Sequence, residues 1–190
     1  KTIFLLIKLM ELNAIVVPLT SETEDQHDYF FKAANVKYIF KYDTFKEINE
    51  NREKNKLIMN LKSRGDGGLI LFSSGTTSKP KAVLHNLRNF LKRFSTPRPT
   101  LKTINFLLFD HIGGINTLFH TLYNFGTVIV PKDRRIETVL KVCKKYNVEL
   151  LPTTPTFLRL LLIGGFIPKK IPASIKIITY GTERMDQITL

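Results

Sequence analysis

The sequence predicts an α/β fold with mostly parallel sheets flanked by helices, and two observations carry that prediction. Short β-branched runs alternate along the chain with segments of helical periodicity, which is the pattern of successive strand–helix units. The runs are almost continuously apolar, as in strands that helices cover on both faces. With 190 residues, 43% of them hydrophobic, the chain is long enough to bury a sizeable core.

The expected strands share an enrichment in Val, Ile, Leu and Phe. They span residues 14–19, 36–40, 69–74, 105–110, 127–131, 148–152 and 175–181. No internal repeat relates them. Because the strands alternate with helices rather than with tight turns, most neighbouring strands should run parallel.

Two later helices are predicted with their ends. Residues 137–148 place a stripe of Val139, Val142, Cys143 and Tyr146 on one face. Cys143 on that stripe is interpreted as a small hydrophobe, and a single cysteine excludes an intramolecular disulfide. In residues 154–162, Thr154 fits the N-cap and Pro155 the first helical position.

The N-terminal region predicts a buried helix followed by a strand. Residues 1–19 are strongly apolar, but Lys8, Glu11 and Asn13 fall within the ~20 residues that a membrane span needs. A signal peptide is disfavoured because no small-residue cleavage site follows. After this region, Ser21 to Glu24 ("SETE") predicts a capping box at the start of another helix.

A polar, charged segment divides the chain. Residues 44–66 are the expected boundary between a first sub-structure, residues 1–66, and a second, residues 67–190. A looser stretch follows at 95–102. Both segments also fit ordinary surface loops.

The net charge of +13 raises a nucleic-acid partner as one hypothesis. The basic residues are scattered, however, and no basic tract with interleaved aromatic residues occurs. Compositional bias of the source therefore accounts for the charge better, and we expect no nucleic-acid partner. The single cysteine fits a reducing, cytoplasmic compartment.

The loop after the run at 69–74 is the strongest candidate site. Between Ser73 and Lys81 the chain carries five hydroxyls, one glycine and two lysines. Gly75 lets backbone N–H groups approach an anion closely, and small hydroxyls add donors without bulk. So many donors favour a polyphosphate. The Walker P-loop is excluded, because its second glycine followed by lysine is missing.

The string "SSGTTSKPKAV" resembles the phosphate loop of the AMP-forming adenylating enzymes, which include acyl- and aryl-CoA synthetases, luciferases and peptide-synthetase adenylation domains. It departs from their pattern at Ser78, where glycine is usual. The resemblance implies that the loop holds the phosphates of ATP. The implied phosphate-binding residues are Ser73, Ser74, Gly75, Thr76, Thr77, Ser78, Lys79 and Lys81, with Thr76 and Lys81 also catalytic.

Two further segments resemble the same family. In "FDHIGGINTLFHTLYNFGTVIVP", His111 stands where the family places a residue against the acyl substrate, and Asp110 stands where an aromatic residue is commoner. The resemblance thus adds His111 to the implied catalytic residues. The apolar residues after His111 fit either a substrate pocket or helix core. Near the end, the resemblance implies adenine contacts at the strand end formed by Tyr180, Gly181, Thr182 and Glu183.

The resemblance implies a function as well. It describes part of an ATP-dependent acyl- or aryl-CoA ligase: residues 1–66 in the N-terminal part of the large domain, residues 67–190 in its nucleotide-binding part, and a C-terminal lysine domain absent. ATP and Mg²⁺ are the implied cofactors, coenzyme A the implied thiol acceptor, and a small carboxylate the substrate. The alternatives are a nucleotide- or acyl-binding module without catalysis and a basic nucleic-acid-binding domain.

No protein-ligated metal site is expected. The remaining histidines, His27, His85 and His120, show no ligand spacing with Cys143 or with a cluster of acids.

Overall fold

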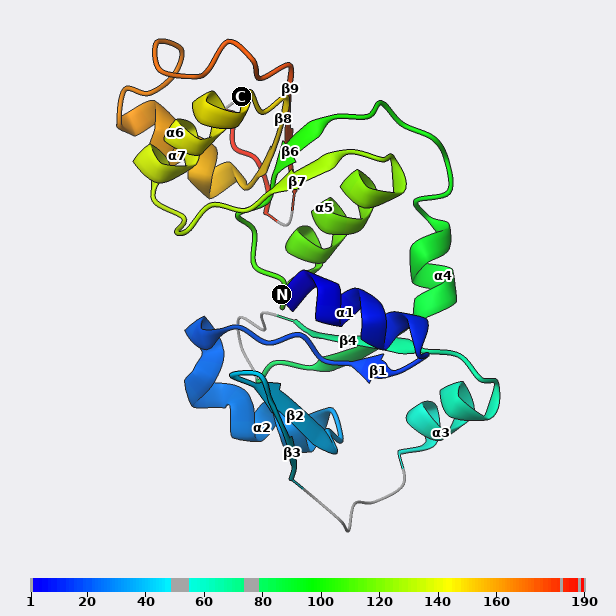
Figure 1. Ribbon diagram of the computed structural model, residues 1–190. Helices are drawn as coiled ribbons and strands as arrows, with labels where there is room; N and C mark the ends of the chain where they lie inside the picture. The colour runs from blue at the N-terminus through cyan, green and yellow to red at the C-terminus, as the bar shows by residue number, and fades with distance from the viewer. Residues whose placement is uncertain (1, 49–54, 74–78, 182, 188, 190) are drawn as a thin grey trace. The chain divides into compact units, whose positions relative to one another are not determined.

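The computed structural model describes residues 2–48, 55–73, 79–181, 183–187 and 189 (Figure 1). The chain forms two compact units. Unit 1 comprises Lys1–Arg93 with Phe109–His111, and unit 2 comprises Phe94–Leu108 with Ile112–Leu190. The division predicted from the sequence, between residues 1–66 and 67–190, describes parts of a larger domain and stays a prediction.

Unit 1 combines a small mixed sheet with a separate hairpin. Its elements are α1 (Thr2–Glu11), β1 (Ile15–Val16), the 3₁₀ helix η1 (Ser21–Gln26), α2 (His27–Ala33), β2 (Tyr38–Lys41), β3 (Thr44–Glu47), α3 (Lys56–Ser63), β4 (Gly68–Phe72), β5 (Ala82–Asn86) and α4 (Leu87–Lys92). In the sheet, β4 is central, parallel to β1 and antiparallel to β5. All five residues of β4 are buried, as its unbroken apolar sequence predicts.

Unit 2 is built from successive strand–helix units. Its elements are β6 (Lys102–Ile104), α5 (Ile112–Tyr123), β7 (Thr127–Ile129), α6 (Ile136–Tyr146), β8 (Leu150–Thr153), α7 (Pro155–Ile163) and β9 (Ile177–Tyr180). The sheet order is β7-β6-β8-β9, and every pair is parallel. Figure 1 shows α6 and α7 on one face of this sheet and α5 on the other. The predicted α/β class with mostly parallel sheets is confirmed.

The core of unit 2 lies between the sheet and the helices α6 and α7. Its fully buried members include Ile104, Val139, Cys143, Leu151 and Leu161. Burial raises the pKa of the Cys143 thiol to about 11, so the thiol stays protonated at neutral pH. The prediction that Cys143 acts as a small hydrophobe is confirmed.

The predicted start of the helix at Thr154 and Pro155 is confirmed in unit 2, whereas the helix predicted over residues 137–148 ends two residues early. The Thr154 hydroxyl accepts a hydrogen bond from the Phe157 amide at 3.2 Å, and Pro155 opens α7. Helix α6 begins one residue earlier than predicted and stops before Asn147, whose φ of 52° is left-handed.

Two local predictions are wrong. Residues 105–110 do not form a strand, because the chain turns after β6: the Asn105 side-chain amide donates to the carbonyl of Gly114 at 2.9 Å. A Cβ on Gly114 would lie 2.1 Å from the Leu108 carbonyl oxygen, so only glycine permits this close return. The capping box predicted at Ser21 is also absent. Ser21 is already the first residue of the 3₁₀ helix η1, and Thr20 occupies the N-cap position of that helix.

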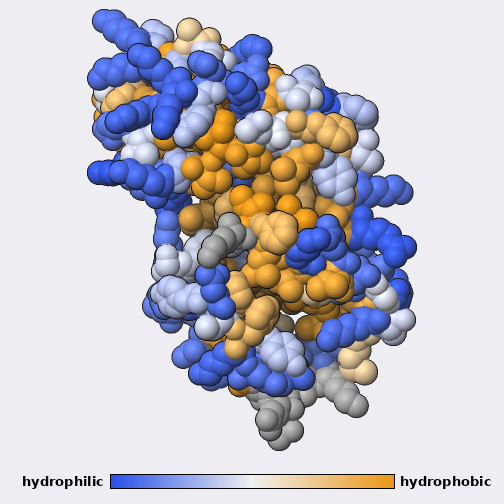
Figure 2. All heavy atoms as spheres, viewed as in Figure 1, coloured by the Kyte–Doolittle hydropathy of each residue, from blue (hydrophilic) through white to orange (hydrophobic). Residues whose placement is uncertain are grey.

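The N-terminal prediction of a helix followed by a strand is confirmed by α1 and β1, although only Leu6 and Met10 of α1 are buried. Figure 2 shows hydrophobic side chains gathered over α1 and hydrophilic ones over the outer surface near α6 and α7. Among the described residues, no helix is long and apolar enough to cross a membrane.

Two strands that the sequence did not predict, β3 and β5, are paired antiparallel with their neighbours.

Candidate functional site

The two ends of the predicted phosphate loop are hydrogen-bonded to each other at its base. Where β4 ends, the Ser73 amide donates to the Lys81 carbonyl at 3.0 Å. In return, the Lys81 amide donates to the Ser73 hydroxyl oxygen at 3.2 Å. The side chains of Ser73, Lys79 and Lys81 are exposed. The ladder between β4 and β5 thus continues past Phe72, and both lysines stand where the loop returns to the sheet.

Five of the predicted phosphate ligands lie outside the described residues. They are Ser74, Gly75, Thr76, Thr77 and Ser78. Their contacts with phosphate, and the catalytic role of Thr76, stay predictions.

Helix α2 supports this loop base from the side. Phe30 is buried and stacks on Phe72, with ring centroids 4.0 Å apart and planes 24° apart. The neighbouring Tyr29 donates its hydroxyl to the Pro80 carbonyl at 2.8 Å. Stacked aromatic rings and a tyrosine hydroxyl with a partner are typical of well-packed sites. One helix therefore contacts both the entering and the returning side of the loop.

A cavity of about 330 Å³ lies against the loop base. Ser73 and Pro80 line it on the loop side, and Asp110 and His111 line it from the segment before α5. Phe30, Phe72 and Leu19 give it apolar walls. A small apolar cavity with a few convergent polar groups is the usual form of a ligand site. The structure thus brings together Ser73, Pro80 and His111.

Asp110 is the most unusual group in this cavity. The residue is only 6% exposed, and its Oδ2 accepts a hydrogen bond from the Thr20 hydroxyl at 2.7 Å. Within the described part of the chain, Oδ1 is buried without a hydrogen-bond partner. His111 Nε2 lies 3.8 Å from that oxygen, and the His111 side chain is 45% exposed. A buried, half-satisfied carboxylate is costly, which favours a ligand donor at Oδ1.

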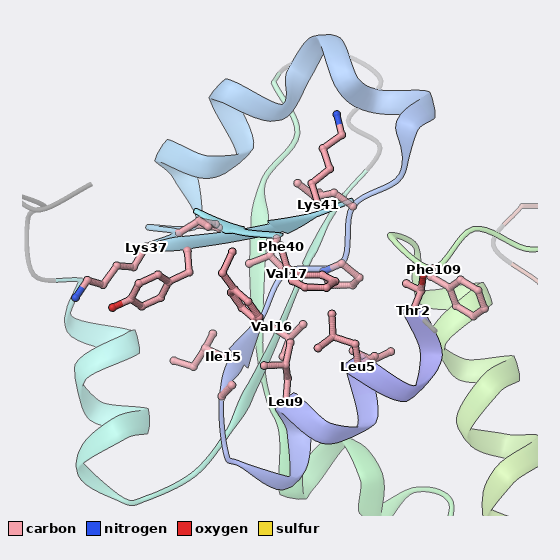
Figure 3. A pocket seen from close by; sticks show the side chains of 18 of the residues that line it. Thr2, Leu5, Leu9, Ile15, Val16, Val17, Lys37, Phe40, Lys41 and Phe109 are labelled. Atoms are coloured by element: carbon pink, nitrogen blue, oxygen red, sulfur yellow. The ribbon is translucent and has the colours of Figure 1, made fainter. Parts of the chain in front are cut away.

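A second, larger cavity in unit 1 has a different character. It measures about 1010 Å³ and lies among α1, β1 and the β2–β3 hairpin (Figure 3). Figure 3 shows Leu5, Leu9 and Val17 around an apolar interior. The two labelled lysines pair with acids: Lys37 with Glu47 at 3.2 Å and Lys41 with Glu24 at 2.5 Å. Most of the residues of α1 and β1 that line this cavity are apolar, which distinguishes it from the cavity at the loop base.

The predicted adenine contacts lie in unit 2, at the carboxyl ends of its parallel strands. Tyr180 ends β9 and is 50% exposed, beside the buried Thr153 that ends β8. Glu183 Oε2 accepts hydrogen bonds from the Thr156 amide at 3.1 Å and the Thr156 hydroxyl at 2.5 Å. Glu183 thereby caps the first turn of α7. Thr182 lies outside the described residues, and a Cβ at Gly181 would meet open space.

Sequence reasoning missed two polar groups at this same edge. Asn105 follows β6 and Thr153 ends β8, and β6 lies next to β8 in the sheet. Asn105 Oδ1 and Thr153 Oγ1 are buried without hydrogen-bond partners among the described residues. Ligands of open α/β sheets bind outside the carboxyl ends of the strands. Their position at the carboxyl ends of two strands that are neighbours in the sheet was the signal that could have identified them.

The apolar residues after His111 form helix core. Ile115 and Leu118 of α5 are fully buried, and neither lines either of the two cavities described above. Of the two interpretations of this segment, the structure supports core packing.

The other histidines show no sign of metal ligation in the part of the chain that the structure describes. Burial, together with nearby Arg93, lowers the pKa of His85, and burial with nearby Arg98 lowers the pKa of His120. In the described ranges, no group of three or more His, Cys, Asp and Glu side chains gathers. The expectation of no protein-ligated metal stays a prediction.

Comparison with protein families gives a match to the family described as AMP-binding enzyme, over residues 61–190. Among curated proteins, bacitracin synthase 2 of Bacillus licheniformis is 32% identical over 110 residues, which is 52% of this chain and 4% of that protein. Bacitracin synthase 1 of the same organism is 22% identical over 202 residues, covering 92% of this chain and 4% of that protein. The chain therefore spans only a small part of these relatives.

Solved structures share the fold. The inhibitor-bound N-terminal domain of FACL13 from Mycobacterium tuberculosis matches with a TM-score of 0.57 and 17% identity, over 66% of this chain and 33% of that one. The o-succinylbenzoate CoA synthetase of Bacillus subtilis, in complex with its acyl-adenylate intermediate, matches with a TM-score of 0.52 and 24% identity. That match covers 61% of this chain and 31% of the synthetase.

Proposed function

Because the chain belongs to the AMP-binding enzyme family, we propose that it forms part of an AMP-forming acid–thiol ligase that activates a small carboxylate with ATP. The observation that carries this proposal is the loop base at Ser73 and Lys81, which borders a cavity containing Asp110 and His111. Phosphate-binding residues and an acyl site are needed side by side, since the reaction joins the two substrates.

The reaction proceeds in two steps. A carboxylate oxygen attacks the α-phosphorus of ATP, the bond to the β-phosphate breaks, and acyl-adenylate and pyrophosphate form. A thiol, which we take to be coenzyme A, then attacks the acyl carbonyl; its proton goes to solvent and AMP leaves. Neither step needs a covalent enzyme intermediate. The protein acts mainly by orienting the reactants and neutralising charge.

We assign roles to residues on this basis. Lys81 and Lys79, with Ser73 and the hydroxyls of residues 74–78, hold the β- and γ-phosphates. His111 lies at the acyl site, and Tyr180, Gly181, Thr182 and Glu183 contact the adenine. Mg²⁺ carried by the triphosphate would supply further neutralisation of its charge. Two exposed lysines at the loop base fit a polyanionic ligand.

A second candidate concerns the acid substrate. Asp110 Oδ1 has no hydrogen-bond partner among the described residues, and it favours an acid that also carries a hydrogen-bond donor, such as an amino group, over a plain acyl or aryl acid. The two relatives named as bacitracin synthases are compatible with a substrate class other than plain acyl acids. In that case a thiol other than coenzyme A could be the acceptor.

The test is ATP–pyrophosphate exchange with a panel of carboxylates, including amino acids, fatty acids and aryl acids. Exchange by this chain, or by the full-length gene product that contains it, supports the ligase. Nucleotide binding by both without any exchange supports a binding module instead. Binding to nucleic acid that weakens steeply with salt and ignores ATP supports the basic-domain alternative.

Two substitutions test the loop assignment. Lys81→Ala and Thr76→Ala should each weaken ATP binding, by about tenfold or more for the lysine, because a charged donor to phosphate is lost. Lys144→Ala, on the exposed face of α6, is the matched control. If the Lys81 variant binds ATP as the control does, the phosphate assignment is wrong.

A further inference from the structure

Tyr29 makes two contacts with the returning side of the phosphate loop. Its hydroxyl donates to the Pro80 carbonyl across 51 residues of sequence. Its ring lies 5.6 Å, centroid to Nζ, from the ammonium of Lys79. The first contact fixes the backbone between the two lysines, and the second restricts the side chain of one of them.

Pro80 makes the first contact important. Proline has no N–H, so its carbonyl is the only backbone hydrogen-bonding group that this residue offers. Tyr29 occupies that carbonyl with a hydrogen bond of 2.8 Å. The next residue, Lys81, is tied through its own backbone to Ser73. The two tethers together hold the stretch from Lys79 to Lys81 on both sides.

Tyr29 itself is held in place by packing. It is half-buried on α2, and its neighbour Phe30 is 3% exposed and stacks on Phe72. The Tyr29 and Phe30 rings also contact each other, with centroids 5.9 Å apart. Because packing already restrains the Tyr29 ring, its hydroxyl loses little conformational entropy when it bonds to the Pro80 carbonyl. Helix α2 is therefore a rigid support for the loop base.

We propose that Tyr29 is a positioning residue for the triphosphate, which pre-orders Lys79 and Lys81 through the Pro80 carbonyl and the Lys79 ammonium. This inference rests on the proposed function, since it assumes that the two lysines meet the β- and γ-phosphates. Without Tyr29, ATP has to order the lysines as it binds, and that ordering lowers affinity. AMP lacks the β- and γ-phosphates, so its binding should not depend on Tyr29.

The experiment compares ATP and AMP affinities by calorimetry in the full-length gene product. Tyr29→Phe removes the bond to Pro80 and keeps the ring under Lys79, whereas Tyr29→Leu removes both contacts. The matched control is Tyr38→Phe, because Tyr38 also has a lysine 5.1 Å from its ring but lines the other cavity.

We expect Tyr29→Phe to weaken ATP binding about fivefold and Tyr29→Leu more, with AMP binding unchanged in both. In exchange kinetics, KM for ATP should rise while KM for the carboxylate stays constant. The control should match the wild type in every measurement.

Two results would overturn the inference while leaving the ligase intact. One is a Tyr29→Phe variant with the wild-type preference for ATP over AMP. The other is an equal loss of ATP and AMP affinity, which indicates a general structural role. A wild-type protein that binds neither nucleotide would instead refute the proposed function, and this inference with it.

Discussion

Strands β4 and β8 are both wholly buried, yet the chain leaves them in different ways. After β8 it enters α7 directly, with Thr154 capping the helix. After β4 it opens into the loop base, where Ser73 and Lys81 bond to each other and the side chains are exposed. At the first exit, Thr154 serves to begin α7, although the neighbouring Thr153 lies at the edge of the sheet with the predicted adenine contacts. The second leaves polar groups available, which suits a ligand site.

The difference extends to what surrounds each exit. Around β8, the helices α6 and α7 bury one continuous apolar core. Around β4, an apolar cluster that includes Phe30 and Phe72 lies beneath the site. Polar tethers from distant segments, Tyr29 to Pro80 and Thr20 to Asp110, hold the edge of the site. We therefore expect substitutions in the apolar core between β8 and the helices α6 and α7 to change stability, and substitutions at the loop base after β4 to change binding.

The largest expected effect tests the packed side of this comparison. Leu161 on α7 is fully buried in the core, and its neighbour Leu160 is 49% exposed. Leu161→Ala should lower the free energy of unfolding by about 2–5 kcal/mol, because it leaves a cavity. Leu160→Ala should cost less than ~1 kcal/mol. Urea denaturation followed by circular dichroism measures both, and equal losses would contradict the burial assigned to α7.

The next effect tests the polar side. Asp110→Asn keeps an acceptor for the Thr20 hydroxyl, but it puts a buried NH2 group in place of Oδ1 and removes the negative charge beside His111, so stability should change by less than about 1 kcal/mol. If Oδ1 meets an ammonium group of the substrate, exchange with amino-bearing acids should fall about 10- to 100-fold. Asp28→Asn, at an exposed position on α2, is the control.

Two outcomes of the Asp110 experiment distinguish the substrate classes. A loss confined to amino-bearing acids supports the second candidate function. Unchanged exchange with every acid in the panel would show that Asp110 does not contact substrate.

The sequence predicted unit 2 better than unit 1, for physical reasons. Buried parallel strands and capped helices have local signals, and Thr154 with Pro155 is one of them. In the β2–β3 hairpin, the sequence predicted β2 but not β3, because all four residues of β3 are exposed and no hydrophobic alternation marks it. Residues 105–110 have the apolar composition of a strand but do not form one. The chain instead packs closely against Gly114, and this tertiary contact has no local signal in the sequence.

The same distinction applies to the candidate site. The loop itself has a recognisable string, and the resemblance to the adenylating enzymes implies His111. Thr20 and Tyr29 have no local pattern, because their partners lie 90 and 51 residues away. Polar tethers of this length depend on the folded arrangement alone.

The smallest effect compares the two exits directly. Thr154→Ala removes the cap of α7 and should cost about 1 kcal/mol of unfolding free energy, with ATP affinity unchanged. Ser73→Ala removes one acceptor at an exposed loop base, so it should cost only a few tenths of a kcal/mol, roughly, while ATP affinity falls severalfold. Thr154→Ser should restore stability. If both alanine variants instead lose stability and ATP affinity in the same proportion, the two exits serve the same role and the division between a packed and a binding exit is wrong.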